Sequence, residues 1–158
     1  MNNRKRIQSI SPSMIKLIKE THKYTTAPWT SKFNISYIGY GHKITSKDKF
    51  IKLTKKKAET LLEEDLQKLS ASISKYIGRE IHQHHFDVFC HIAYDYSLHS
   101  LKNSSLFIAY LKGELKEDAV RYIMIWSKIQ GIISLSMLFR RNHDIQVFMN
   151  NQYKVERK

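Results

Sequence analysis

The side chain best suited to proton transfer in the first third of the chain is His22, at the end of a predicted helix. An imidazole with an unperturbed pKa of about 6.5 can donate or accept a proton near neutral pH. Carboxylates are scarce around it, because Asp48 is the only Asp or Glu between Glu20 and Glu59. Glu20 precedes His22 by two residues, so its side chain points about 200° away around the helix. His22 therefore lacks an anionic partner from its own part of the chain, and Asp95 is a remote candidate from the other half.

The other reactive side chains favour structural roles. Five histidines form a dense set in the second half of the chain, namely His82, His84, His85, His91 and His99. Their spacings do not match a helix-face metal pair with a third ligand nearby, so we expect no metal ion and no cofactor. Cys90 lies in an apolar helical run and is expected to be an inert core thiol. As a single cysteine it cannot form an internal disulfide, and nothing indicates an oxidising compartment.

The charge of the chain is strongly positive and unevenly placed. The net charge is +13, and residues 1–79 hold 17 Lys and Arg against 6 Asp and Glu, whereas residues 80–158 hold 10 against 8. A field concentrated on one half steers it toward a polyanion, such as nucleic acid, an anionic cell-wall polymer or an anionic lipid surface. The simpler alternative is a lysine-rich face that only keeps the protein solvated.

The elements that must position His22 begin with a helix that Ser11 caps and that ends near Lys23. Residues 24–53 are rich in Thr, Ser, Asn and aromatics, which indicates two or three short strands. From Thr54 the apolar residues recur at spacings of three and four, and Gly78 is a plausible C-terminal stop. A helix of this length is expected to cross the whole molecule and to join two lobes.

The second half of the chain is predicted to be helical. The expected helices cover His84–Tyr94, a stretch capped by Asn103 or Ser104 that runs through Leu111 to Gly113, Glu117–Trp126, and Leu135–Asn150. The first is apolar on most faces and is a candidate core helix. The third places acidic residues in its first turn, as the helix dipole favours. The tail, residues 151–158, is polar and is expected to fray.

Length and composition indicate one domain of 158 residues that is expected to be a monomer. Gly (5) and Pro (2) are scarce, which favours helices over a turn-rich all-β fold. No apolar run approaches the roughly 18 residues of a membrane helix, and the basic N-terminus lacks the apolar region of a secretory signal. We therefore expect the protein to be cytoplasmic at synthesis and to leave, if it does, through a pore or a secretion system.

Short motifs follow one another along the chain in a characteristic order. They are Leu17-Ile18-Lys19, Ile38-Gly39-Tyr40-Gly41-His42, the run from Thr54 to Leu62 with Asp65-Leu66, His85-Phe86-Asp87, Ser104-Ser105-Leu106, Trp126 and Arg140-Arg141. In this order and spacing the chain resembles the phage-type lysozymes, the endolysin muramidases that cleave the glycan of bacterial peptidoglycan. The resemblance extends from about Ser11 to Phe148.

The resemblance implies an α+β, mostly helical fold with two lobes. We expect a small N-terminal β lobe over residues 11–53, an interlobe helix over 54–78, a helical lobe over 79–150 and the polar tail. All of these belong to one lysozyme-like domain.

The resemblance also implies where the catalytic residues should lie. Glycoside hydrolysis needs a protonated acid on the leaving oxygen and a second carboxylate. In this family these are a glutamate at the end of the first helix and an aspartate in the following loop, with a threonine before the I-G-Y-G-H strand. Those positions fall on His22, at or near Ser31, and on Tyr37, so all three differ. Whether the protein is an enzyme is therefore left open.

The cleft is still expected to bind glycan. The resemblance places Lys43, Tyr94 and Ser104 along its walls as candidate substrate-binding residues. Aromatic rings on which sugars could stack, or that belong to the core of the small lobe, are Tyr24, Trp29, Tyr37 and Tyr40.

Three functions from different classes follow. The first is a lysozyme-like protein without standard glycosidase catalysis that binds peptidoglycan, another anionic cell-wall polymer or a protein partner. The second is a glycan-cleaving or glycan-transferring enzyme with repurposed His22 chemistry. The third, a basic nucleic-acid-binding module, ranks last because no nucleic-acid motif accompanies the charge.

Overall fold

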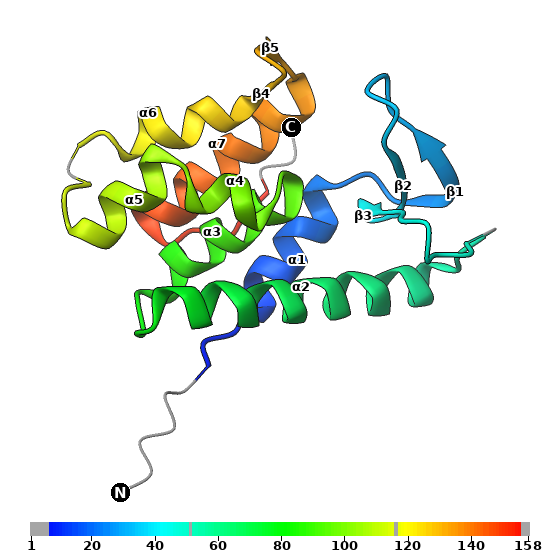
Figure 1. Ribbon diagram of the computed structural model, residues 1–158, viewed down its shortest axis with the longest axis horizontal. Helices are drawn as coiled ribbons and strands as arrows, with labels where there is room; N and C mark the ends of the chain where they lie inside the picture. Colours follow the sequence, from blue (N-terminus) through cyan, green and yellow to red (C-terminus); the bar gives the residue numbers. More distant parts are fainter. Residues whose placement is uncertain (1–6, 51, 116, 156–158) are drawn as a thin grey trace, which may run out of the picture.

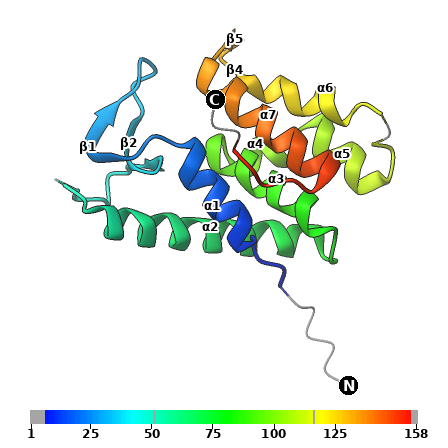
Figure 2. The same ribbon diagram turned by 180° about the vertical axis from the view of Figure 1, so that it is seen from behind.

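The computed structural model of the protein describes residues 7–50, 52–115 and 117–155. The fold is mostly helical α+β, as predicted, with a small antiparallel sheet on one side and packed helices on the other (Figure 1). A long helix, α2 (Lys55–Ile77), extends beneath both parts, and the view from behind shows α1 (Pro12–Thr21) crossing it (Figure 2). The predicted basic start, residues 1–6, lies outside the described residues.

Helix α1 begins where the sequence predicts. The Ser11 hydroxyl accepts a hydrogen bond from the Met14 N–H at 3.2 Å, and proline fills the first helical turn. The helix ends at Thr21, two residues before the predicted Lys23, and His22 takes the C-cap position with extended backbone angles. The end of α1 therefore delivers His22 to the boundary between the sheet and the helices.

The small lobe contains three strands, which confirms the strands predicted for residues 24–53. They are β1 (Thr25–Thr30), β2 (Ser36–Gly39) and β3 (His42–Lys43), in the antiparallel order β1-β2-β3. Trp29 pairs with Tyr37, and Tyr37 pairs with Lys43 on its other side. An irregular stretch of pairing separates Thr25 from Trp29. Cross-strand partners lie side by side, so Trp29, Tyr37 and Lys43 form one row across the sheet.

The turn between β2 and β3 depends on two glycines. Gly39 and Gly41 have φ angles of 65° and 94°, in the left-handed region that side chains disfavour. A Cβ at Gly39 would lie 3.2 Å from the Cβ of Ala58 on α2, and one at Gly41 would lie 3.2 Å from Nδ1 of His22. The two glycines thus allow the turn to approach both α2 and His22 closely.

Helix α2 confirms the long helix predicted from Thr54 to Gly78. Thr54 accepts a hydrogen bond from the Lys57 N–H, and Gly78 ends the helix with a φ of 71°. Its 23 residues correspond to about 35 Å at roughly 1.5 Å per residue. Its buried apolar side chains pack against the sheet, α1 and α3. The helix thus provides a common support for both lobes.

The helical lobe follows. It contains α3 (Gln83–Asp95), α4 (Leu98–Lys102), α5 (Ser105–Lys112), α6 (Ala119–Met124), a 3₁₀ turn (Ile125–Ser127), the strands β4 (Lys128–Ile129) and β5 (Ile132–Ile133), and α7 (Leu135–Asn150). The predicted helices corresponding to α3, α5 and α7 are confirmed, and Ser104 and Gly113 do cap α5. Residues 86–93 of α3 are buried, including Cys90, the pKa of which burial raises. Helix α3 is therefore the core of this lobe.

The helical lobe differs from the prediction in three places, of which the first is the unpredicted short helix α4. The predicted helix over Glu117–Trp126 is shorter, and its acidic residues precede the first turn, where Asp118 pairs with Arg121 at 3.2 Å. The β4–β5 hairpin was not predicted. In the structure its two turn residues, Gln130 and Gly131, both have positive φ angles, as a tight two-residue hairpin turn requires. Among the described residues, no helix has the length and apolar character needed to cross a membrane.

The C-terminal segment is anchored through Asp87 rather than frayed, over its described part. The Tyr153 hydroxyl donates to Oδ2 of Asp87 at 2.7 Å, and the N–H and hydroxyl of Ser11 donate to the same carboxylate at 2.9 and 2.5 Å. Gln83 adds a fourth donor at 2.8 Å. Asp87 thus joins the start of α1, α3 and residues 151–155, while 156–158 lie outside the described residues.

Replacement of Asp87 should measurably destabilise the fold. Asp87→Ala removes a buried carboxylate and leaves donors from three segments without this acceptor, which should lower the free energy of unfolding by about 3 kcal/mol. Tyr153→Phe removes one of these hydrogen bonds and should cost about 1 kcal/mol. Urea denaturation measures both, with Asp118→Ala as a surface control. Equal stability of the Asp87 and Asp118 variants would contradict the anchoring role.

Candidate functional site

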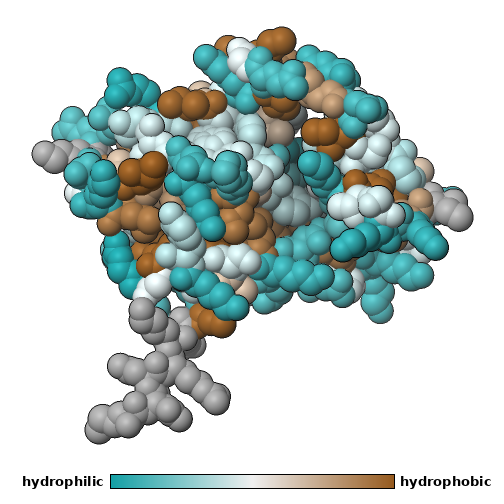
Figure 3. Space-filling model, in the orientation of Figure 1, coloured by the Kyte–Doolittle hydropathy of each residue, from teal (hydrophilic) through white to brown (hydrophobic). Residues whose placement is uncertain are grey.

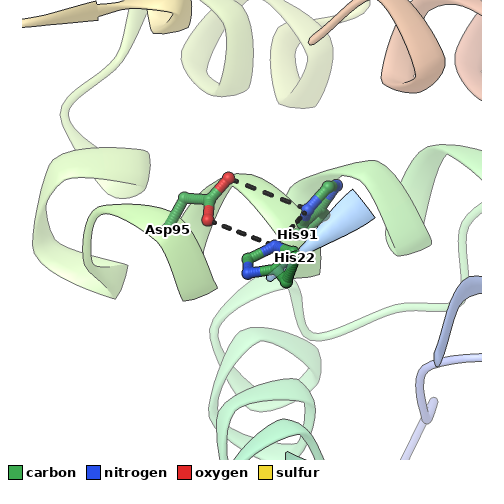
Figure 4. Close-up of side chains that lie close together, drawn as sticks. All are labelled: His22, His91 and Asp95. Carbon is green, nitrogen blue, oxygen red and sulfur yellow. Dashed lines mark hydrogen bonds and ion pairs between the residues drawn. The ribbon is translucent and has the colours of Figure 1, made fainter. Parts of the chain in front are cut away.

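His22 lies in a buried cluster of polar side chains between α1 and α3. Only 3% of its side chain is exposed, and its ring centroid lies 5.3 Å from that of His91 and 5.7 Å from that of Tyr94. Its Nε2 atom is 3.0 Å from Nε2 of His91 and 3.4 Å from Oδ1 of Asp95 (Figure 4). The remote carboxylate candidate from the other half of the chain is therefore an immediate neighbour.

Helix α3 places two of these groups on one face. His91 and Asp95 are four residues apart, or about one helical turn, so both side chains point toward His22. On its other side, His91 bonds through Nδ1 to Oδ1 of Asp144 at 2.6 Å. An ionised carboxylate only accepts hydrogen bonds, so Nδ1 of His91 carries the proton. In the neutral ring this leaves the lone pair of Nε2 directed at His22.

Two arginines from α7 neutralise the carboxylates. Arg140 donates to Oδ1 of Asp95 at 2.8 Å, and Arg141 donates to Oδ2 at 2.6 Å. Arg141 also forms an ion pair with Asp144 at 2.7 Å. The side chains of Arg141 and Asp144 are fully buried, and that of Asp95 is 2% exposed. Buried charges persist only when they are paired, and here two positive and two negative groups balance.

The surroundings fix the protonation states of this cluster. Burial lowers the pKa of His22 well below 6.5, because the charge of Asp95 does not offset burial and the nearby arginines. The pKa of Asp95 lies below its usual range even though burial opposes ionisation. Since His22 is neutral near pH 7, the permanent charges of Arg140 and Arg141 maintain this shift. At neutral pH the cluster therefore contains an uncharged imidazole beside an ionised carboxylate.

The small lobe reaches this cluster through aromatic residues. The Tyr94 hydroxyl donates to the Tyr40 carbonyl at 3.1 Å and so joins α3 to the glycine-rich turn. Burial and the charge of Asp95 raise the pKa of Tyr37, so its phenol lies within electrostatic range of the cluster. Tyr37 also stacks on Trp29, with ring centroids 5.1 Å apart. The glycine-rich turn is therefore in direct contact with α3, and an aromatic pair lies on the same sheet.

The other predicted site residues have different environments. The Ser31 hydroxyl accepts hydrogen bonds from the N–H groups of Phe33 and Ile35, both at 3.3 Å, within the turn after β1. Lys43 is exposed on β3. Ser104 caps α5 and also donates to the Leu101 carbonyl at 2.7 Å. The structure thus places Tyr94 against His22, whereas Tyr37 packs on Trp29 in the sheet and the Ser31 hydroxyl is bonded within its own turn.

Ser104 borders a separate pocket of about 310 Å³. The pocket is lined by Ser100, Asn103, Ser104, Ser105, Leu106, Tyr122, Ile125 and Trp126. Trp126, one of the motif residues, therefore lies next to the motif turn that contains Ser104. The substrate-binding roles of Lys43, Tyr94 and Ser104 remain predictions.

Sequence reasoning missed part of the cluster. From the sequence we expected no helix-face metal pair with a third ligand nearby, and we did not consider Asp95 as a helix-face partner of His91. His91 and Asp95 form such a pair, and the H-x-x-x-D spacing was visible in the sequence. Asp144 lies 53 residues from His91, so no local pattern could have joined them.

Other carboxylates of the small-lobe region are engaged elsewhere. Glu20 is exposed and pairs with Lys16 at 3.9 Å, which confirms that it points away from His22. Asp48 lies 3.6 Å from Nε2 of His42, and Asp65 lies 2.6 Å from its Nδ1. An imidazole thus occupies the space between these two carboxylates, and they do not form an acid pair around a sugar-sized gap.

Comparisons with known proteins agree with the fold. The structure has a three-stranded lobe, a long connecting helix and a helical lobe, and the two lobes meet at the end of α1. This arrangement is that of a phage-type lysozyme fold. The chain belongs to the phage lysozyme family, whose sequence model, described as phage lysozyme, matches residues 19–144. This confirms the resemblance on which the site positions depend.

Individual relatives are distant. The chain is 29% identical over 151 residues to an endolysin of Bacillus phage B103, covering 92% of this chain and 56% of that protein. For an endolysin of Bacillus phage PZA the identity is 26% over 144 residues, with 88% and 54% covered. The chain thus spans about half the length of the curated relatives that it matches.

Solved structures share the fold at low identity. An endolysin from Escherichia coli phage FAHEc1 matches with a TM-score of 0.79 and 20% identity, covering 96% of this chain and 99% of the other. The muramidase domain of SpmX from Asticaccaulis excentricus matches with a TM-score of 0.75 and 18% identity, covering 93% and 99%. Both likenesses extend over essentially the whole fold.

The His42 contacts should make stability depend on pH. The hydrogen bond to Asp65 and the charges of Asp65 and Asp48 raise the pKa of His42 above 6.5, although burial opposes this. Because the folded protein holds the proton more tightly, the stabilisation is fully present below about pH 6.5 and is lost as pH rises through the raised pKa. Relative to His42→Gln, the wild type should be more stable by roughly 1–3 kcal/mol at about pH 5. That advantage should shrink toward pH 9.

Urea unfolding of both proteins at several pH values measures this difference. His99→Gln, at an exposed site, controls for the loss of a histidine as such. A wild-type advantage that grows as pH rises would contradict the assigned direction.

Proposed function

We propose that this protein binds peptidoglycan between its two lobes and does not carry out the standard glycosidase reaction. The observation that supports this most is the position of Asp95. It is the carboxylate beside the helix-end site where the family carries its acid, and both of its oxygens accept hydrogen bonds from arginines.

The placement of the described carboxyl groups around His22 supports the loss of standard glycoside hydrolysis. That reaction needs two carboxyl groups that face the sugar from opposite sides of the scissile bond. The His22 side chain points into the protein, Asp95 is 2% exposed, and Asp144 is fully buried behind His91. The Ser31 hydroxyl is bonded within its own turn. Among the described residues, this arrangement offers the groove no pair of free acids.

Features suited to binding a glycan remain. Figure 3 shows the surface hollowed between the small lobe and the helical lobe. Trp29 is 47% exposed and stacks on Tyr37, and aromatic faces of this kind suit the apolar faces of sugar rings. Lys43 is next to Tyr37 in the sheet. The excess of positive charge on residues 1–79 would draw this lobe toward an anionic wall polymer.

Sedimentation with purified peptidoglycan sacculi tests the binding. The wild type should co-sediment with sacculi, and binding should weaken at high salt because charge steers the association. Trp29→Ala should lower the affinity by about threefold to tenfold through loss of one stacking surface. Tyr76→Ala, which removes an equally exposed aromatic from α2, is the matched control and should bind like the wild type.

Release of reducing ends from the same sacculi tests the loss of catalysis. The wild type should release no more than His22→Ala, while an active muramidase digests the sample as a positive control. Turnover by the wild type well above that variant would overturn the catalytic part of the proposal. Failure to co-sediment at low salt would overturn the binding part.

A further inference from the structure

We propose that His22, His91 and Asp95 bind one divalent transition-metal ion of the zinc type. Nε2 of His22, Nε2 of His91 and a carboxylate oxygen of Asp95 lie within 4.8 Å of one another. The three groups come from the end of α1 and one face of α3, and Figure 4 shows them directed at one another. The proposal goes beyond peptidoglycan binding and does not depend on it.

The separations suit a tetrahedral ion. With metal–ligand bonds of about 2.0–2.1 Å, neighbouring donors of a tetrahedral site lie roughly 3.3 Å apart. The two Nε2 atoms are 3.0 Å apart, and they lie 3.4 and 3.7 Å from the two oxygens of Asp95. Small adjustments of the side chains would place one ion against all three. Two imidazoles and one carboxylate are also a ligand set that zinc accepts.

Asp144 provides the outer contact that such a site needs. A histidine that binds a metal usually donates its other ring N–H to a carboxylate, which fixes the ring and its tautomer. His91 does this through Nδ1 to Asp144 at 2.6 Å, and its free Nε2 faces His22. A carboxylate bonded in this way makes Nε2 of His91 a stronger metal ligand.

His22 can provide its Nε2 in the same manner. Binding of an ion at Nε2 requires the proton of the neutral ring to lie on Nδ1. Nδ1 of His22 faces the backbone of Gly41, where even a Cβ would approach to 3.2 Å. The glycine at this position therefore leaves room for the protonated Nδ1 edge of the ring.

Two features oppose tight binding. Arg140 and Arg141 already neutralise Asp95 and Asp144, so the charge of the ion is not balanced by the cluster. Without an ion, the 3.0 Å contact is a hydrogen bond from Nε2–H of His22 to Nε2 of His91. Binding of the ion requires this proton to move to Nδ1 of His22 and the hydrogen bond to break, so we expect an affinity below that of a site without arginines.

Titration with Co²⁺ tests the site in untagged, chelator-treated protein. The wild type should develop the visible absorption of tetrahedral cobalt up to one equivalent, and Zn²⁺ should abolish it by competition. His22→Gln and Asp95→Asn should each weaken binding by about tenfold or more. Asp144→Asn should weaken it by about 10-fold to 100-fold through the outer contact.

The surface histidines provide the matched control. His82, His84 and His85 have ring centroids 4.1–5.7 Å apart and could hold a metal adventitiously. His84→Gln should leave the cobalt signal unchanged. Loss of the signal in His84→Gln, with retention in His22→Gln, would show an adventitious surface ion and overturn the proposal, as would absence of any signal at one equivalent.

A second measurement avoids variants that fold poorly. In the wild type, Co²⁺ should shift the imidazole proton resonances of His22 and His91 before those of His82 and His84. The opposite order would overturn the assignment. Neither experiment contains peptidoglycan, so failure here leaves the sacculus experiments unaffected, and failure of those leaves the metal site standing.

Discussion

The ion pairs of Asp95 with Arg140 and Arg141 are the interaction on which the site depends. They fix the carboxylate of α3 against α7, and Asp144 extends the same network to His91. His22 then closes the network from the end of α1. Charges buried to this degree are stable only together, because removing one partner leaves another without compensation. Buried polar contacts therefore fix the positions of α1, α3 and α7 relative to one another.

This network also supports the proposal that His22 does not act as a general acid. A general acid must hold a proton near the reacting bond and release it to the leaving group. The cluster instead directs the His22 ring toward His91 and Asp95, away from solvent. Tyr94 and Tyr40 connect the same cluster to the sheet, so the wall that carries Tyr37 and Trp29 is positioned by it. The cluster that contains His22 thus also helps to position the sheet.

Local signals in the sequence predicted most of the scaffold. Caps such as Thr54 with Gly78, and Ser104 with Gly113, are decided by residues within a turn or two, so the helix ends could be predicted. The short helix α4 and the β4–β5 hairpin were not predicted, since each contains too few residues for a periodic pattern. The partnership of His91 with Asp144 requires the packing of α3 on α7, which no spacing in the sequence reveals.

Nε2 of His22 and Nε2 of His91 lie 3.0 Å apart in the buried cluster, and what occupies the space between them determines the charge of the cluster. A proton between them gives a neutral hydrogen bond, whereas a metal ion between them adds two positive charges to a cluster that is otherwise balanced. The charges of Asp95 and Arg140 already contribute to the pKa of Tyr37. A metal ion in the cluster would therefore change the electrostatic potential at Tyr37. If both proposals hold, the occupant of this buried contact would influence how the small lobe binds an anionic polymer, without any group of the cluster touching the glycan.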